Sequence, residues 1–249
     1  MTPVNASAES APLGGLALVI GAAGGLGLAL AQQLLLAQGQ PGAHQAVLTL
    51  SRSSQPGLDY SDEDSVATAA RWVAERCAGT SLELRLLLVA SGFLHGEQGQ
   101  PERSWSQLDA RYLSHAFLVN AIGPALVMKH FLPLLPRQGR CIAAFVSARV
   151  GSIGDNALGG WYGYRASKAA LNQLVKTASI ELTRRNRDSV CVALHPGTVD
   201  TALSRPFAKT GLNVRQPQEA ARDVLAALER QRPVDTGSLI DFRGEKLRF

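Results

Sequence analysis

The 249-residue sequence is poor in cysteine, in aromatic residues and in long apolar runs. Its three cysteines, Cys77, Cys141 and Cys191, are far apart and lie in apolar or helical surroundings. This spacing fits neither a disulfide framework nor a metal site, so we expect reduced cysteines in the core and no bound metal. No uncharged apolar run reaches the ~18 to 20 residues of a membrane-spanning helix, and we expect no membrane association.

The sequence also lacks a secretory signal and a strong excess of charge. Residues 1–15 have neither a basic start nor a separate apolar core, and we interpret them as a flexible N-terminal extension of a cytoplasmic protein. The 25 basic and 20 acidic residues give a net charge of +5, but the basic residues are scattered and no nucleic-acid-binding motif accompanies them. We therefore expect no nucleic-acid partner.

Residues 16–249 show no repeat, linker or abrupt change of composition, which predicts a single domain. Five short apolar runs have the length of strands that are buried on both faces of a parallel sheet: Leu16 to Ile20, Ala46 to Leu50, Leu82 to Ala90, Cys141 to Ser147 and Val190 to His195. Helical patterns lie between and after them: Gly27 to Gln38, the stretch after Ser61 and Asp62 up to Cys77, Ser104 to Leu135, Tyr164 to Arg185, and Pro217 to Arg230. This alternation predicts an α/β Rossmann fold, a doubly wound parallel sheet flanked by helices on both faces, which binds ligands at the carboxyl ends of its strands.

A glycine-rich turn follows the first predicted strand and leads directly into a helix. It contains Gly21, Gly24, Gly25, Leu26 and Gly27 in the spacing GxxxGxG. Glycines allow a tight turn and let a pyrophosphate approach the N–H groups at a helix N-terminus. A merely flexible turn is the alternative, but the strand-turn-helix context favours a dinucleotide site. A triphosphate-binding loop does not fit, because no Gly-Lys-Ser/Thr follows.

The second predicted strand ends at Ser51 and Arg52, with no acidic residue before Asp59. In dinucleotide-binding folds an acidic residue near this place binds the ribose 2′-hydroxyl, whereas an arginine accommodates a 2′-phosphate. We therefore predict a preference for NADP(H), with NAD(H) as a possible second cofactor. The alternative is that Arg52 is an ordinary solvated side chain.

Tyr164 and Lys168 are four residues apart, which places a phenol and an ammonium on one helical face. A cation near a phenol lowers the pKa of the phenol, so Tyr164 is a candidate general acid or base. Tyr162 is a weaker candidate because Lys168 lies six residues on, nearly opposite on the helix. A pair with this spacing is common on solvated helices, and its meaning depends on the surrounding motifs.

The glycine turn, the Tyr164 and Lys168 pair, and His195-Pro196-Gly197-Thr-Val-Asp-Thr201 together resemble the short-chain dehydrogenase/reductase family in order and spacing. The resemblance covers roughly Leu16 to Phe249. The stretches Val119 to Pro124 and Ser147 to Lys168 resemble more narrowly its C-factor and carbonyl-reductase-like branch.

The resemblance implies that Tyr164 transfers a proton, that Lys168 lowers the pKa of Tyr164 and holds the nicotinamide ribose, and that a serine polarises the substrate oxygen. It also implies that Asn120 anchors a water for proton relay. Pro124 supports this role independently, because it has no N–H and leaves the Asn120 carbonyl free. A helix kink without catalytic meaning is the alternative.

The resemblance further implies residues that contact the cofactor. From the adenine end to the nicotinamide end they are Asp59, Tyr60, Ala90, Ser91, Gly92, Pro196, Gly197, Val199 and Thr201.

The sequence departs from the family pattern at two places. Val89-Ala90-Ser91-Gly92 lacks the asparagines of the usual Asn-Asn-Ala-Gly, and we expect backbone groups and Ser91 to replace part of their hydrogen bonding. Ala148 stands where the family usually has its catalytic serine. Ser147 is our candidate for that role, with Ser152 or no serine as alternatives.

These observations predict an NADPH-dependent oxidoreductase that interconverts a carbonyl and an alcohol on a small-molecule substrate. The alternative is a low-activity NADP(H)-binding sensor or C-factor-like signalling protein, which a site without a serine would suit. Ala202 to Gln216 is a candidate lid over the substrate, and Phe93, Leu94, Trp161 and Phe207 suggest a partly apolar pocket. The resemblance also suggests a homo-oligomer, either a dimer or a tetramer.

Overall fold

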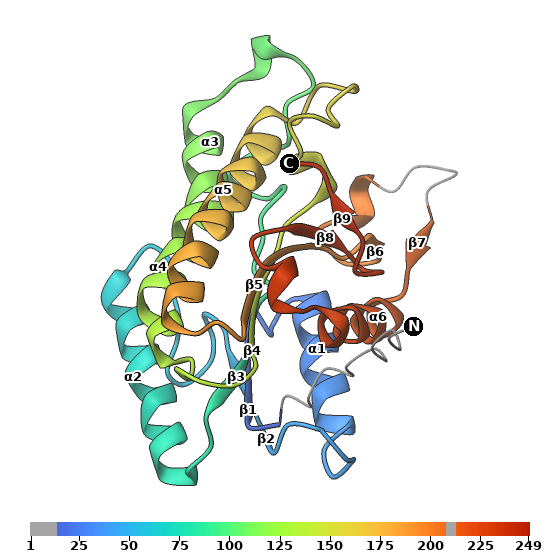
Figure 1. Ribbon diagram of the computed structural model, residues 1–249. Coiled ribbons are helices and arrows are strands. Elements are labelled where there is room, and N and C mark those ends of the chain that lie inside the picture. The colour runs from blue at the N-terminus through green and yellow to red at the C-terminus, as the bar shows by residue number, and fades with distance from the viewer. Residues whose placement is uncertain (1–13, 208–212) are drawn as a thin grey trace, which may run out of the picture.

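The computed structural model describes residues 14–207 and 213–249. Most of the predicted N-terminal extension, residues 1–13, and residues 208–212 of the candidate lid lie outside the described residues. A seven-stranded sheet lies between two layers of helices (Figure 1). Its strands are β1 (Leu16–Ile20), β2 (Ala46–Leu50), β3 (Leu84–Val89), β4 (Cys141–Val146), β5 (Ser189–His195), β8 (Leu239–Asp241) and β9 (Lys246–Leu247).

The strand order is β2-β1-β3-β4-β5-β8-β9, and all neighbours are parallel except β8 and β9. The chain runs outward in opposite directions from β1 and β3, which makes the crevice between their carboxyl ends the switch point where doubly wound folds bind ligands. The α/β Rossmann fold predicted from the sequence is confirmed.

The helices cover both faces of the sheet. One layer contains α2 (Glu63–Thr80), α3 (Ala110–Phe117), α4 (Gly123–Phe131) and α5 (Tyr162–Arg185), and the other contains α1 (Gly25–Leu36) and α6 (Pro217–Arg230). Short 3-10 helices are η1 (Trp105–Gln107), η3 (Leu132–Leu134), η4 (Arg149–Gly151), η5 (Arg205–Phe207) and η6 (Pro233–Asp235), and η2 (Leu118–Ile122) is a π-helical turn. A separate two-stranded parallel sheet pairs β6 (Thr198–Val199) with β7 (Val214–Arg215).

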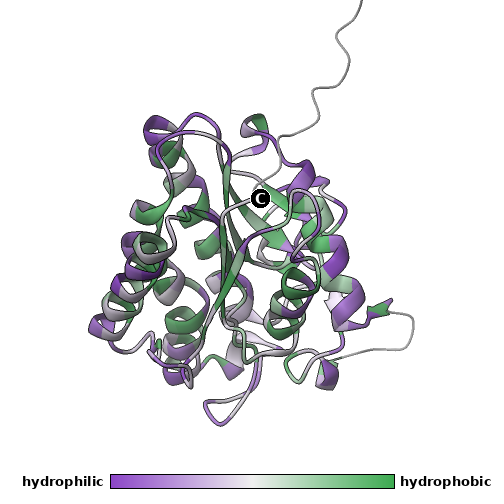
Figure 2. Cartoon of the chain, turned by 90° about the horizontal axis from the view of Figure 1, so that it is seen from below, coloured by the Kyte–Doolittle hydropathy of each residue, from purple (hydrophilic) through white to green (hydrophobic). Residues whose placement is uncertain are grey.

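Alternation along the strands divides the core into two clusters, one on each face of the sheet. In β4, Cys141 and Phe145 face the cluster under α2, α4 and α5, whereas Ile142 faces the cluster under α1 and α6. The view coloured by hydropathy shows the apolar residues on the strands and on the inner sides of the helices (Figure 2). Cys141 and Cys191 are free and buried as predicted, and the free Cys77 is half-buried.

The predicted strands and helices are present, and apart from the helix expected from Ser104 their bounds differ from the prediction by no more than three residues. The bounds of β1 and β2 are those predicted, but the helix expected from Ser104 begins at Ala110, because the Asp109 side chain caps it by accepting from the Tyr112 N–H at 2.8 Å. That helix is also interrupted by the π-helical turn η2 just before Pro124. The sequence did not predict the short strands β6 to β9, which are two or three residues long and have no extended apolar run.

One helical segment among the described residues, Ala110–Leu134, is apolar and long enough by length and composition to cross a membrane. A single segment of this kind is weak evidence, because a core helix passes the same test. Here the segment contains the fully buried Asn120 and packs along α5.

Candidate active site

A single cavity of about 1230 Å³ lies at the carboxyl ends of β1 to β5. Every site residue predicted from the sequence lines it except Gly27 and Asn120. The motifs are far apart in the sequence, and the parallel strands bring them together because each motif follows the end of a strand.

The glycine turn forms the floor beneath the N-terminus of α1. Gly21 has φ +87°, in the left-handed region, and its carbonyl accepts from the Gly24 N–H at 3.1 Å. A Cβ at Gly27 would lie 2.3 Å from the Gly21 oxygen, so Gly27 allows the turn to fold onto the helix and does not itself line the cavity. Gly24 is the N-cap and provides no side-chain cap, so N–H groups of the first turn are available to an anion.

Arg52 lines the cavity at its edge, on the exposed turn after β2. Asp59 is also exposed there, and its pKa is lowered mainly by hydrogen bonds from the backbone and side chain of Ser61, with a smaller contribution from Arg52. The guanidinium therefore stands at the cavity edge, where a 2′-phosphate could reach it.

Tyr60 belongs to the β2–α2 connection and lies beside the end of β3, where the Val89-Ala90-Ser91-Gly92 segment lacks asparagine. Its hydroxyl lies 2.7 Å from the Ser91 hydroxyl, and burial raises the pKa of Tyr60 to about 12. Its ring lies against Gly123, where a Cβ would come within 2.2 Å of the ring. Ser91 thus connects β3 to the β2–α2 connection through Tyr60, a contact that the sequence did not predict.

Tyr164 and Lys168 lie in the first two turns of α5 and are both buried. The Lys168 Nζ donates to the Val146 carbonyl at 2.8 Å and lies 5.9 Å from the centre of the Tyr164 ring. Burial raises the pKa of Tyr164 to about 12 and lowers the pKa of Lys168 to about 7. In this structure burial, and not the Lys168 ammonium, therefore governs the pKa of Tyr164.

Asn120 lies behind the cavity wall in η2. Its Oδ1 accepts from the Phe93 N–H at 2.8 Å, and its Nδ2 donates to the Phe93 carbonyl at 2.8 Å and to Ser167 Oγ at 3.0 Å. A Cβ at Gly92 would lie 3.7 Å from Asn120 Oδ1 and 3.8 Å from Lys168 Nζ, so the amide and the ammonium both lie beside Gly92. The side chain of Asn120 thus fixes the chain that leaves β3.

Pro124 causes the interruption of the helix at Asn120, as the sequence indicates. Pro124 has no N–H to continue the regular pattern, and the Gly123 N–H donates to the Leu118 carbonyl, five residues back. The structure therefore contains a local irregularity where Pro124 predicts one.

The two serine candidates have different surroundings. Ser147 lines the cavity, but its Oγ donates to Asn172 Oδ1 at 2.6 Å inside the interface between β4 and α5. Ser152 is buried outside the cavity lining, and its Oγ accepts from the Asp155 N–H at 3.2 Å. Ala148 is buried in one apolar cluster with Tyr164 and Leu94, and Val150 packs against that cluster.

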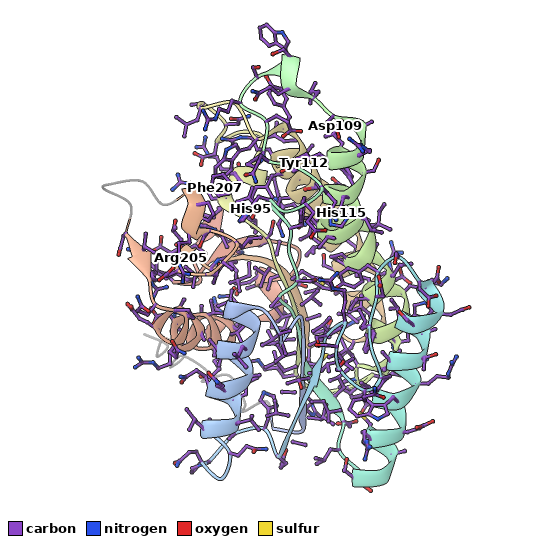
Figure 3. All side chains as sticks on the ribbon, turned by 180° about the vertical axis from the view of Figure 1, so that it is seen from behind. His95, Asp109, Tyr112, His115, Arg205 and Phe207 are labelled. Atoms are coloured by element: carbon purple, nitrogen blue, oxygen red, sulfur yellow. The ribbon has the colours of Figure 1, made fainter. Side chains whose placement is uncertain are left out.

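Three aromatic side chains, Trp161, Phe207 and His95, line the cavity together, and we call them the aromatic wall. The centre of the Trp161 ring lies 6.1 Å from that of Tyr164 and 5.3 Å from that of Phe207. The Phe207 ring lies 5.3 Å from the His95 ring, and Figure 3 labels these two side chains. His95 Nε2 lies 3.1 Å from the Ala202 carbonyl, which can only accept, so Nε2 carries the proton. The sequence had indicated the apolar residues of this wall but not His95, an isolated histidine three residues after Gly92.

The described charges of the candidate lid are paired within the protein. Arg205 forms an ion pair with Asp200 at 3.0 Å, and the buried Arg215 pairs with Asp223 and Glu219. The two arginines are therefore neutralised by carboxylates of the protein itself, one just before the lid and two on α6. Lys209 lies outside the described residues.

His195 also lines the cavity at the end of β5, and burial lowers its pKa to about 4, so the imidazole is neutral at pH 7. Within the described parts of the chain, no group of three His, Cys, Asp or Glu side chains is placed to hold a metal ion.

The chain is similar to known proteins over most of its length. A family model described as short chain dehydrogenase matches residues 15–211. The C-signal of Myxococcus xanthus is 34% identical over 140 residues, which cover 56% of this chain and 80% of that protein. The 1-hydroxy-2-glutathionyl-2-methyl-3-butene dehydrogenase of Rhodococcus sp. is 30% identical over 184 residues, which cover 74% of either chain. The NADPH-bound carbonyl reductase from chicken fatty liver has the same fold, with a TM-score of 0.80 at 24% identity, over 98% of this chain and 97% of that one.

Proposed function

Because this chain belongs to the short-chain dehydrogenase family, we propose that it is an NADPH-dependent carbonyl reductase in which Tyr164 protonates the substrate oxygen. The observation that carries the proposal is the single cavity that joins the glycine turn and Arg52 at one end to Tyr164 and Lys168 at the other. A dinucleotide with a 2′-phosphate has matching groups along this length.

The residues present fit this cofactor. The uncapped N-terminus of α1 would hold the pyrophosphate, and Arg52 would hold the 2′-phosphate through charge-assisted hydrogen bonds. Gly92 leaves room beside Lys168 for the nicotinamide ribose. When bound, NADPH supplies the hydride that reduces the carbonyl carbon.

Tyr164 is suited to the acid role because burial raises its pKa to about 12, so it carries its proton throughout the neutral range. Lys168, with a pKa near 7, can hold or release a proton under the same conditions. We propose that Lys168 returns a proton to Tyr164 and receives one from a water bound at the Asn120 carbonyl. Asn120 is suited to this role because its side chain already fixes the strand end beside Lys168.

The contacts favour the alternative in which no serine acts as a second donor. Ser147 gives its hydroxyl hydrogen to Asn172, and Ser152 lies outside the cavity lining. Ala148 presents only a methyl group beside Tyr164. Tyr164 then provides the hydroxyl that polarises the substrate oxygen, and Ser147 connects β4 to α5.

Replacing Tyr164 with phenylalanine tests the catalytic part of the proposal. Tyr164→Phe should abolish oxidation of NADPH by a panel of small aldehydes and ketones, while the dissociation constant of NADPH stays within about 2-fold, since the hydroxyl is the only group removed. Wild-type protein that binds NADPH tightly but turns over no carbonyl would contradict the proposal and favour a sensor.

Replacing Arg52 tests the cofactor preference. A charge-assisted hydrogen bond contributes about 1.5 to 3 kcal/mol, so Arg52→Asp should weaken NADPH binding by about 10- to 150-fold and leave NADH binding nearly unchanged. Arg71→Asp makes the same change of charge on the exposed surface of α2 and serves as the control. Equal loss of affinity for both cofactors in Arg52→Asp would refute the assignment.

A further inference from the structure

Glu102 is a buried carboxylate that belongs to none of the sequence motifs. It lies in the connection between β3 and α3 and is 3% exposed. Its two oxygens accept from the Gly163 N–H at 3.0 and 3.2 Å, and its main-chain carbonyl accepts from the Trp161 N–H. Both donors lie at the N-terminus of α5, within three residues of Tyr164.

The N-terminus of α5 needs a partner from outside the helix. Its N-cap residue, Trp161, has φ +54° and provides no side-chain cap, and the two residues before it, Gly159 and Gly160, have φ +64° and +65°. A left-handed conformation is unfavourable for a bulky residue and persists only where its surroundings impose it. The hydrogen bonds that Glu102 accepts from Gly163 and Trp161 provide such a constraint, and the helix dipole favours a carboxylate at this end.

The contact is possible because Gly163 has no side chain. A Cβ there would lie 2.8 Å from Tyr112 Cε1 and 3.1 Å from Glu102 Oε1. Tyr112 belongs to α3 (Figure 3), and its hydroxyl donates to the Leu94 carbonyl at 2.8 Å. Glu102 and Tyr112 therefore both lie against the first turn of α5 at Gly163.

We propose that Glu102 is a positioning residue, whose carboxylate caps α5 at Gly163 and thereby sets the places of Tyr164 and Trp161 in the active site. Tyr164 follows Gly163 directly, and the Trp161 ring lies 6.1 Å from the Tyr164 ring. The proposal rests on the proposed reductase function, since it concerns the orientation of the Tyr164 hydroxyl toward the substrate oxygen. A displacement of about 1 Å at a reacting group lowers a rate by up to about 100-fold.

Asn186 provides a matched control at the opposite end of the same helix. It is also 3% exposed, and its amide donates to the Pro136 and Gly139 carbonyls at 3.0 and 2.9 Å. Asn186→Ala and Glu102→Ala should each lower the melting temperature by about 2 to 4 °C. Only Glu102→Ala should also lower kcat, by about 10- to 100-fold, with the dissociation constant of NADPH within 2-fold of wild type. A wild-type kcat in Glu102→Ala, or an equal loss in Asn186→Ala, would overturn the proposal.

Two conservative variants separate the hydrogen bond from the charge and keep the test informative if Glu102→Ala does not fold. Glu102→Gln keeps an acceptor of the same reach, and we expect its kcat to stay within about 3-fold of wild type. Glu102→Asp keeps the charge but withdraws the acceptor from Gly163 by one methylene, and we expect a loss near that of Glu102→Ala. The reverse order of these two variants would contradict the capping role.

A second measurement separates failure of this proposal from failure of the proposed function. In a Trp72→Phe, Trp105→Phe background, Trp161 is the remaining tryptophan. Glu102→Ala should shift its emission maximum to longer wavelength as the ring leaves the aromatic wall, whereas Asn186→Ala should not. If the wild-type protein reduces no carbonyl, the proposed function fails and this emission still decides: an unchanged maximum in Glu102→Ala would refute the positioning role.

Discussion

Replacing Lys168 with methionine should change the free energy of unfolding with a sign that depends on pH. Lys168 is 2% exposed, and burial lowers its pKa from 10.5 to about 7. The unfolded chain therefore holds this proton up to about pH 10.5, whereas the folded protein releases it near pH 7. Between these values the unfolded state binds more protons, so stability rises with pH, and the full cost of burying the charge is present below pH 7.

The size of the effect follows from this pKa. A fall from 10.5 to about 7 corresponds to about 5 kcal/mol at pH 6 and to almost nothing near pH 10.5. The methionine also removes the hydrogen bond from Nζ to the Val146 carbonyl, which leaves a buried acceptor and costs about 1 to 3 kcal/mol at any pH. Lys168→Met should therefore stabilise the protein by about 2 to 4 kcal/mol at pH 6. At pH 10, where about 1 kcal/mol of the cost of the charge remains, it should destabilise the protein by up to about 2 kcal/mol.

Urea unfolding of the cofactor-free protein at pH 6, 8 and 10 measures this change. Lys176→Met is the control, because Lys176 lies two turns further along α5 and is exposed, and its effect should stay within about 0.5 kcal/mol at every pH. If Lys168→Met destabilises the protein equally at pH 6 and pH 10, then burial does not depress the pKa of Lys168 and the reasoning is refuted.

Three further changes test the site. Ala148→Ser places a hydroxyl beside Tyr164 and should raise kcat for carbonyl reduction by about 10- to 100-fold, measured by NADPH absorbance; an unchanged kcat would show that no donor is missing. With the pKa of Tyr164 near 12, the rate of alcohol oxidation should rise about tenfold per pH unit from pH 7 to 10, because that direction needs the phenolate, and a flat profile would contradict the pKa. Gly123→Ala places a Cβ 2.2 Å from the Tyr60 ring and should lower the free energy of unfolding by about 1 to 3 kcal/mol in urea; wild-type stability would mean that Tyr60 moves freely.

The sequence predicted the parts of the fold that depend on continuous apolar runs. The bounds of β1 and β2 follow from five-residue apolar stretches, and each motif that follows a strand lies at the cavity because parallel strands end at one edge of the sheet. The late strands β8 and β9 were not predictable in this way, because strands of two or three residues depend on their neighbours for pairing.

The sequence predicted those parts of the site whose residues lie a few positions apart in the chain. The spacing of Tyr164 and Lys168 places them on one helix, but it cannot show that both groups are buried, and burial governs the pKa of each. The environment of Ser147 depends on strand alternation, which directs its hydroxyl toward Asn172 on α5, 25 residues later. Only the folded chain reveals that contact.

Contacts between distant segments could not be inferred from single motifs. The Tyr60 and Ser91 hydroxyls are 31 residues apart in sequence, and His95 reaches Ala202 across 107 residues. Neither pair has a characteristic spacing. Their partners are defined by the arrangement of loops around the switch point of the sheet.

The cap on α5 also has a consequence for the order of folding. Gly163 and Glu102 are 61 residues apart, so the first turn of α5 gains its cap only after the chain has closed a long loop through α3, α4 and β4. The body of α5 can form earlier through its local hydrogen bonds and its contacts with β5. Folding should therefore proceed along this helix toward Tyr164, and we expect the first turn of α5 to be among the last backbone segments to gain protection from hydrogen exchange.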